Sequence, residues 1–115
     1  LWGSGTPLRE FLFVDDMAEA VVFALENKLP DYLYNIGTGV DLTIKELAET
    51  IQKITGHQGE IIWDASKPDG TPRKLMDISK MHDLGWKHKI DLEEGIQMTY
   101  DWFLENENGI KEVKM

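Results

Sequence analysis

The stretch LTIKELAETIQKITG, residues 42–56, carries the clearest structural signal in the chain. Thr43 is a residue type that caps helices, and Glu46, three positions later, completes a capping box. The apolar residues that follow recur at helical spacing: Ile44, Leu47, Ala48, Ile51 and Ile54. Gly56 stands where many helices end in a left-handed residue. The sequence therefore predicts an amphipathic helix that begins after Thr43 and ends at Gly56.

The residues before this helix predict a strand, a helix and a second strand. Residues 9–14 are rich in aromatic and β-branched side chains, which favours a strand. Asp16 and Glu19 have the capping-box spacing, so we expect Asp16 to cap the helix that follows. Residues 32–36 predict the next strand, and a glycine-rich turn separates it from the helix after Thr43.

The residues after Gly56 predict a strand and then an exposed loop. The strand is expected over residues 60–63. Residues 64–74, with the sequence DASKPDGTPRK, cannot continue it because proline lacks the N–H that a strand ladder needs. A short extended segment over residues 74–77 is expected to leave the loop.

Two more helices are expected toward the end of the chain. Ser79 is expected to cap a short helix that ends at Gly85, with Trp86 as a core residue. Asp91 is expected to cap the last helix, with Glu94 completing a capping box. The buried face of this helix is predicted to comprise Leu92, Ile96, Tyr100, Phe103 and Leu104.

These elements predict an α/β fold with short strands, three main helices and one short helix. Residues 1–107 are expected to form a single subdomain, and residues 108–115 a polar tail that frays. A chain of 115 residues suits one domain and no more.

Composition excludes several classes of function. The 12 Lys and Arg residues are outnumbered by 21 Asp and Glu, which argues against general nucleic-acid binding and against an anionic membrane surface. The absence of cysteine excludes disulfides, thiolate ligands and a cysteine nucleophile within this chain. There is no apolar run near ~20 residues and no secretory leader, so we expect a cytoplasmic protein.

The loop at residues 64–74 is unusual because it gathers cations in a chain of net charge -9. Lys67, Arg73 and Lys74 lie within it. Arginine offers a planar fork of donors that matches phosphate oxygens, and lysine offers a point charge. The loop has two interpretations: ordinary surface charge, or a site for a small ligand that contains phosphate.

The other motifs in the sequence give weaker indications of function. Gly37-x-Gly39 follows a predicted strand, but the third glycine of a dinucleotide-binding fingerprint is missing, so a plain turn is the better interpretation. The three histidines lack metal-ligand spacing, and no metal site is expected. No self-contained catalytic constellation is found, so we expect no catalytic residue in this chain.

Two further segments connect the cationic loop to a known family. They are WGSGTPLREF at residues 2–11, which runs into VDD at 14–16, and YNIGTG at residues 34–39. Together they resemble the C-terminal part of the extended short-chain dehydrogenase/reductases that act on nucleotide sugars. The segment ASKPDGTPRK at residues 65–74 is more specific. With WGSGTP and the closing aromatic cluster at 100–103, it resembles the branch that makes GDP-L-fucose.

This resemblance covers essentially the entire chain and implies a parent enzyme. Members of that branch are NADPH-dependent oxidoreductases and epimerases, which invert C3 and C5 of GDP-4-keto-6-deoxy-D-mannose and reduce C4. The resemblance implies substrate-binding roles for Trp2, Arg9, Asp69 and Lys74, and for Arg73 as the neighbour of Lys74. Arg9 and Lys74 suit a diphosphate, Trp2 offers an aromatic surface, and Asp69 accepts hydrogen bonds.

The resemblance also implies what this chain lacks. In the family the glycine-rich NADP loop, the Ser/Tyr/Lys reductase residues and the Cys/His epimerisation pair lie in the N-terminal portion. Because the chain starts at Leu1 in a turn-rich motif, we expect a fragment of a longer protein. The resemblance implies that the parent is a homodimer. The fragment alone is expected to bind no cofactor and to be inactive.

Two alternatives stand beside this expectation. One is the substrate domain of another nucleotide-sugar epimerase or dehydratase, against which the loop at residues 67–74 argues. The other is a non-catalytic acidic module that binds protein rather than a nucleotide.

Overall fold

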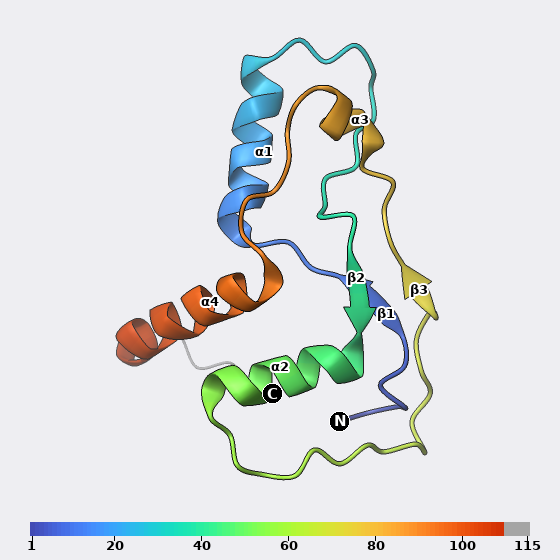
Figure 1. Cartoon of the computed structure of the whole chain (residues 1–115), viewed down its shortest axis with the longest axis vertical. Helices are drawn as coiled ribbons and strands as arrows, with labels where there is room; N and C mark the ends of the chain where they lie inside the picture. Colours follow the sequence, from blue (N-terminus) through green and yellow to red (C-terminus); the bar gives the residue numbers. More distant parts are fainter. Residues whose placement is uncertain (110–115) are drawn as a thin grey trace.

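A small three-stranded sheet lies at the centre of the fold (Figure 1). The computed structural model describes residues 1–109, so the predicted tail at 108–115 lies almost wholly outside the described residues. The strand order is β2-β1-β3, with β1 antiparallel to β2 and parallel to β3. The strands are β1 Leu8–Glu10, β2 Asp41–Thr43 and β3 Arg73–Lys74.

Four α-helices and a short 3-10 turn accompany the sheet in the described part of the chain. They are α1 Val14–Glu26, α2 Ile44–Thr55, α3 Ser79–Asp83, α4 Leu92–Asn106 and η1 Glu107–Gly109. In Figure 1, α1 and α3 lie at one end of the molecule and α2 and α4 at the other, with the sheet between them. The predicted α/β class with short strands is confirmed.

Helix α2 forms as predicted. Thr43 accepts a hydrogen bond from the Glu46 amide (3.1 Å), while the Glu46 carboxylate accepts one from the Thr43 amide (2.7 Å). These reciprocal bonds satisfy donors that the first turn of a helix leaves unpaired. The helix ends at Gly56 with φ 68°, in the left-handed region.

The prediction for Asp16 is wrong. Helix α1 begins at Val14, after Phe13, and no side chain caps it. Asp16 instead lies inside the first turn, where it is 3% exposed and accepts hydrogen bonds from the backbone amides of Lys89 and Ile90, each 3.0 Å. The carboxylate ties α1 to the segment before α4, a long-range role that local sequence spacing does not reveal.

Two predicted strands do not form. Residues 32–36 and 60–63 have irregular backbone, and β1 is shorter than the predicted 9–14. A strand needs a partner along its length to satisfy its N–H and C=O groups. Among residues 1–109 the second segment gains only an isolated bridge at its end, Trp2 with Asp64. Strand β2 was not predicted, because it is a three-residue segment directly before α2.

The two C-terminal helices are found with different caps from those predicted. Ser79 is the first residue of α3 rather than its cap, and its hydroxyl donates to the Asp77 carboxylate (2.6 Å). Asp91 does precede α4, but its side chain makes no capping hydrogen bond, so the box with Glu94 is absent. Asp91 is instead directed toward solvent, with its side chain 92% exposed.

The core is small and lies between α1 and α3. Ala20, Met81 and Trp86 are buried there, which confirms the core position predicted for Trp86. The radius of gyration, 16.9 Å, exceeds the about 13 Å expected of a compact domain of roughly this length. The molecule is therefore open, and the predicted buried face of α4 is only partly covered: Phe103 is 46% exposed.

Candidate functional site

The predicted site residues lie on strands β1 and β3 and on the segments next to them. Figure 1 shows the chain leaving α2, passing the N-terminal segment and returning into β3. The N-terminal segment is held to this returning chain, since the Gly3 amide donates to the Asp64 carbonyl (3.0 Å) and the Asp64 amide donates to the Leu1 carbonyl (2.8 Å). Sequence segments some 60 residues apart therefore build one surface.

Arg9 and Lys74 are paired residues of adjacent strands. Arg9 is opposite Lys74 in the parallel register of β1 and β3. Residues in register point to the same face of a sheet, and successive residues along a strand alternate between faces. Arg9 and Lys74 therefore share one face, together with Leu42 of β2, which is the antiparallel partner of Arg9. The described part of the chain contains no ion pair to either cation.

Beside Arg9 lies a small cavity of about 130 Å³. Its lining combines the N-terminal turn, β1, the start of α2 and the loop before β3: Trp2, Gly5, Pro7, Arg9, Ile44, Pro68, Asp69 and Gly70. Trp2 is 77% exposed and has the ammonium of Lys67 5.5 Å from its ring centroid, within the range of a cation–π contact. The structure thus brings Trp2, Arg9 and Asp69 together.

Asp69 has a structural partner at the rim of this cavity. Its carboxylate accepts hydrogen bonds from the Ser4 amide (2.8 Å) and the Ser4 hydroxyl (2.6 Å). The hydroxyl bond first, and the amide bond second, lower the pKa of Asp69 below the ordinary value for aspartate. The carboxylate is therefore ionised at neutral pH. Its hydrogen bonds with Ser4 connect the loop at residues 64–74 to the N-terminal turn. Sequence reasoning missed Ser4, whose only signal was its place between Gly3 and Gly5.

Arg73 is not brought to the same face. It alternates with Lys74 along β3 and forms a two-pronged ion pair with Asp41 of β2, with Nε 2.6 Å and Nη2 3.2 Å from the two carboxylate oxygens. This contact raises the pKa of Arg73 and keeps it charged. Asp41 is largely covered, with its side chain 10% exposed. Sequence reasoning missed Asp41 because its partner lies 32 residues away and on a different strand.

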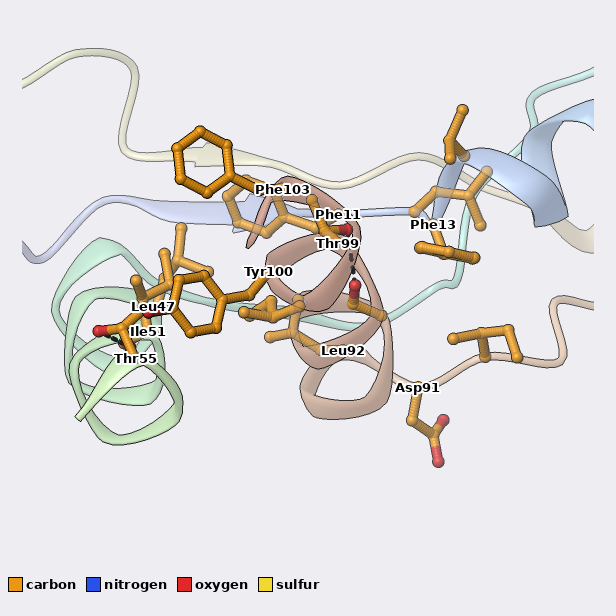
Figure 2. A pocket seen from close by; sticks show the side chains of 15 residues that line it. Phe11, Phe13, Leu47, Ile51, Thr55, Asp91, Leu92, Thr99, Tyr100 and Phe103 are labelled. Carbon is orange, nitrogen blue, oxygen red and sulfur yellow. Dashed lines mark hydrogen bonds between the residues drawn. The ribbon is translucent and has the colours of Figure 1, made fainter. Parts of the chain in front are cut away.

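A second, larger cavity is apolar. It has a volume of about 630 Å³ and lies between α2, α4 and the segment that joins β1 to α1. Figure 2 shows the side chains that line it, among them Phe11, Ile51, Tyr100 and Phe103. Asp91 stands at its edge with the carboxylate directed away. With so few polar groups, this cavity offers hydrophobic contact rather than chemistry.

The described residues contain no cluster of His, Asp or Glu able to hold a metal ion. Within residues 1–109, no helix has the length and apolar character needed to cross a membrane.

Comparison with known proteins gives the site its context. Residues 1–37 match the NAD dependent epimerase/dehydratase family. Over 96% of its length the chain is 56% identical to a GDP-L-fucose synthase of Escherichia coli (strain K12), and over 92% it is 54% identical to a probable GDP-L-fucose synthase 1 of Oryza sativa subsp. japonica. It spans 37% and 32% of those two proteins, about a third of their length.

Comparison with solved structures agrees with the sequence comparison. A GDP-L-fucose synthetase from Naegleria fowleri superposes with a TM-score of 0.89 at 28% identity, over 97% of this chain and 35% of that one. A GDP-6-OMe-4-keto-L-xylo-heptose reductase from C. jejuni gives a TM-score of 0.85 at 41% identity, over 92% of this chain and 33% of that one.

The fold and these matches relate the chain to the epimerase/dehydratase class of proteins. Within that class the two sequence relatives named above are GDP-L-fucose synthases, and the chain corresponds to about a third of the length of each. The resemblance inferred from residues 2–11, 34–39 and 65–74 is confirmed.

Proposed function

We propose that this chain is the nucleotide-sugar-binding portion of a GDP-L-fucose synthase. The parent enzyme would epimerise GDP-4-keto-6-deoxy-D-mannose at C3 and C5 and reduce C4 with NADPH, giving GDP-L-fucose. The observation that carries the proposal is the pairing of Arg9 with Lys74 on one face of the sheet. Arg9 and Trp2 line the cavity beside this pair. The high identity to GDP-L-fucose synthases supports it.

Each residue has a role in this proposal. Arg9 and Lys74 bind the diphosphate through charge-assisted hydrogen bonds, which are stronger than neutral ones. Trp2 supplies an exposed aromatic surface for the base or the sugar. Asp69 keeps lone pairs beyond those used by Ser4 and can accept a hydrogen bond from a hydroxyl or a base N–H. Arg73, next to Lys74, contributes indirectly, because its ion pair with Asp41 holds β3 in place.

These contacts would contribute to the reaction by positioning the substrate, and not by transferring protons or hydride. Fixing the nucleotide end of the substrate orients the sugar toward the catalytic groups, which lowers the entropic part of the barrier. We propose that the catalytic groups belong to another part of the parent polypeptide, and that the chain alone catalyses neither epimerisation nor reduction.

NADP is proposed to bind elsewhere in the parent, and the Gly37–Gly39 turn supports this. A phosphate-binding glycine turn needs open space and free amides. Here a Cβ added to Gly37 would lie 2.4 Å from a carboxylate oxygen of Glu10, and the Gly39 amide already donates to that oxygen (2.7 Å). An anionic side chain therefore stands where a pyrophosphate would have to lie. The residues of this turn do not fit the cofactor.

We further propose that the parent is a cytoplasmic homodimer. The alternative of an acidic interaction module is less favoured, because the cationic pair and its cavity have the chemistry of a phosphate site.

Nucleotide selectivity tests the proposal. GDP, UDP and dTDP are titrated by calorimetry into the intact polypeptide that contains this chain. We expect GDP to bind at least tenfold more tightly than UDP or dTDP. Equal binding of all three would favour a different nucleotide-sugar enzyme, and binding of none would overturn the proposal.

A further inference from the structure

Glu10 joins three parts of the chain through one carboxylate. Its Oε1 accepts hydrogen bonds from the Gly39 amide (2.7 Å) and the Thr38 hydroxyl (3.5 Å), and its Oε2 accepts one from the Met76 amide (3.2 Å). Glu10 therefore connects β1 to the turn before β2 and to the segment that leaves β3. Glu10 is not among the residues proposed to contact the substrate.

The sequence around the turn accommodates this carboxylate. Gly37 is buried, and a side chain there would collide with the carboxylate of Glu10. The turn therefore approaches Glu10 closely only because residue 37 has no Cβ.

A second carboxylate acts on β3 from the same side of the sheet. Asp41 is the cross-strand partner of Glu10 in the β1–β2 pairing, so both side chains point to the face opposite Arg9 and Lys74. Asp41 holds Arg73, the residue before Lys74, and Glu10 holds Met76, two residues after it. Lys74 is thus flanked by two anchored residues.

Strand β3 needs such anchors because it is only two residues long. Short strands specify their register weakly, and a slip of one residue moves every side chain to the other face. A slip here would take Lys74 away from Arg9 and would put Arg73 or Leu75 in its place.

From these contacts we infer that Glu10 and Asp41 are positioning residues, which fix the register of β3 and so hold Lys74 beside Arg9 for a diphosphate. The inference deepens the proposed function and depends on it for the role of Lys74. The register itself can be tested without a ligand.

The first variant is Glu10→Gln. A carboxylate can accept on both oxygens, whereas glutamine accepts on one side and donates on the other. The amide nitrogen would then face either the Gly39 or the Met76 amide, and one bond would be lost without a change in volume. The matched control is Glu49→Gln, an exposed glutamate on α2. Asp41→Asn weakens the second anchor.

The first measurement is amide hydrogen exchange in the intact polypeptide. The Leu8 amide donates to the Pro72 carbonyl across the β1–β3 pair (2.8 Å), so it reports on the pairing. We expect Glu10→Gln and Asp41→Asn each to speed exchange at Leu8 at least tenfold. Exchange in α2 should be unchanged, and Glu49→Gln should leave Leu8 unaffected. Unaltered Leu8 exchange in both variants would overturn the inference.

The second measurement is GDP affinity in a double-mutant cycle. If Glu10 acts through Lys74, Glu10→Gln should weaken GDP binding at least fivefold, but less than twofold when Lys74→Ala is already present. If Lys74→Ala itself weakens GDP binding, a loss of equal size in both backgrounds would show a general structural effect and would overturn the inference. A different outcome is faster Leu8 exchange in the anchor variants together with a GDP affinity that Lys74→Ala does not change. This outcome would overturn the proposed function alone and would leave the register role of Glu10 and Asp41 supported.

Discussion

Arg9 and Lys74 lie directly opposite each other in the parallel pairing of β1 with β3. Adjacent strands are about 4.8 Å apart, and like charges placed opposite each other are unfavourable. The described part of the chain provides no carboxylate that pairs with either cation. A bound anion would relieve this repulsion, which is the physical basis for placing a diphosphate here.

The capping box of α2 should contribute measurably to stability. Thr43→Ala removes the hydroxyl that accepts from the Glu46 amide, and we expect the free energy of unfolding to fall by about 1 kcal/mol. Asp91→Ala is the comparison, because Asp91 precedes α4 without a capping hydrogen bond and should cost less. Urea denaturation of both variants checks this. An equal or larger loss for Asp91→Ala would contradict the assigned caps.

Asp16 should matter far more than its neighbour Asp15. Asp16→Ala leaves the part-buried amides of Lys89 and Ile90 without their acceptor, so we expect a loss of about 1–3 kcal/mol. Asp15 is exposed in the same helical turn, and Asp15→Ala should change stability by less than about 0.5 kcal/mol. Similar effects in thermal or urea unfolding would show that Asp16 is not the tie between α1 and α4.

The loop that carries Asp69 should loosen in acid. Hydrogen bonds from Ser4 lower the pKa of Asp69, so they stabilise the closed loop above the ordinary aspartate pKa. This stabilisation is lost as the pH falls through the lowered pKa of the folded state. An NMR titration of the Asp69 carboxyl carbon should give a midpoint below the ordinary value. In Ser4→Ala the midpoint should rise toward it, and no rise would refute the contact.

Glycine at position 5 is required for two reasons. Its φ is 76°, and a Cβ there would lie 2.7 Å from the Trp63 ring. Gly56 has a similar φ of 68° but open space around it, so Gly56→Ala should cost only the backbone strain of about 1 kcal/mol. Gly5→Ala should cost more because the ring must also move. Equal losses of stability in the two variants would mean that Trp63 does not pack on Gly5.

The parts of the fold that sequence predicted correctly are those with local causes. The capping box and glycine end of α2 are formed by residues three or four positions apart, so the pattern alone reveals them. The strands at 32–36 and 60–63 were predicted from composition, but a strand depends on a partner from elsewhere in the chain. Asp16 was assigned to a local cap, whereas its partners are 73 and 74 residues away.

At the candidate site, too, the sequence revealed local motifs but not contacts between residues far apart in the chain. Trp2, Arg9, Asp69 and Lys74 were selected by motif resemblance. The structure places Trp2, Arg9 and Asp69 around one cavity and pairs Lys74 with Arg9. Ser4, Glu10 and Asp41 were not selected, because their contacts cross 65, 29 and 32 residues of sequence. Arg73 was grouped with Lys74 as a neighbour, yet alternation along β3 directs it to the opposite face.

The most direct test of the central claim is GDP affinity of the intact polypeptide after Arg9→Ala and Lys74→Ala. Lys53→Ala serves as the charge-matched control, since Lys53 lies at the end of α2 beside Glu93. A charge-assisted hydrogen bond is worth about 1.5–3 kcal/mol, so each site variant should weaken GDP at least tenfold, while the control stays within about twofold. GDP binding that is unchanged in both site variants would contradict the claim that this cationic pair holds a diphosphate.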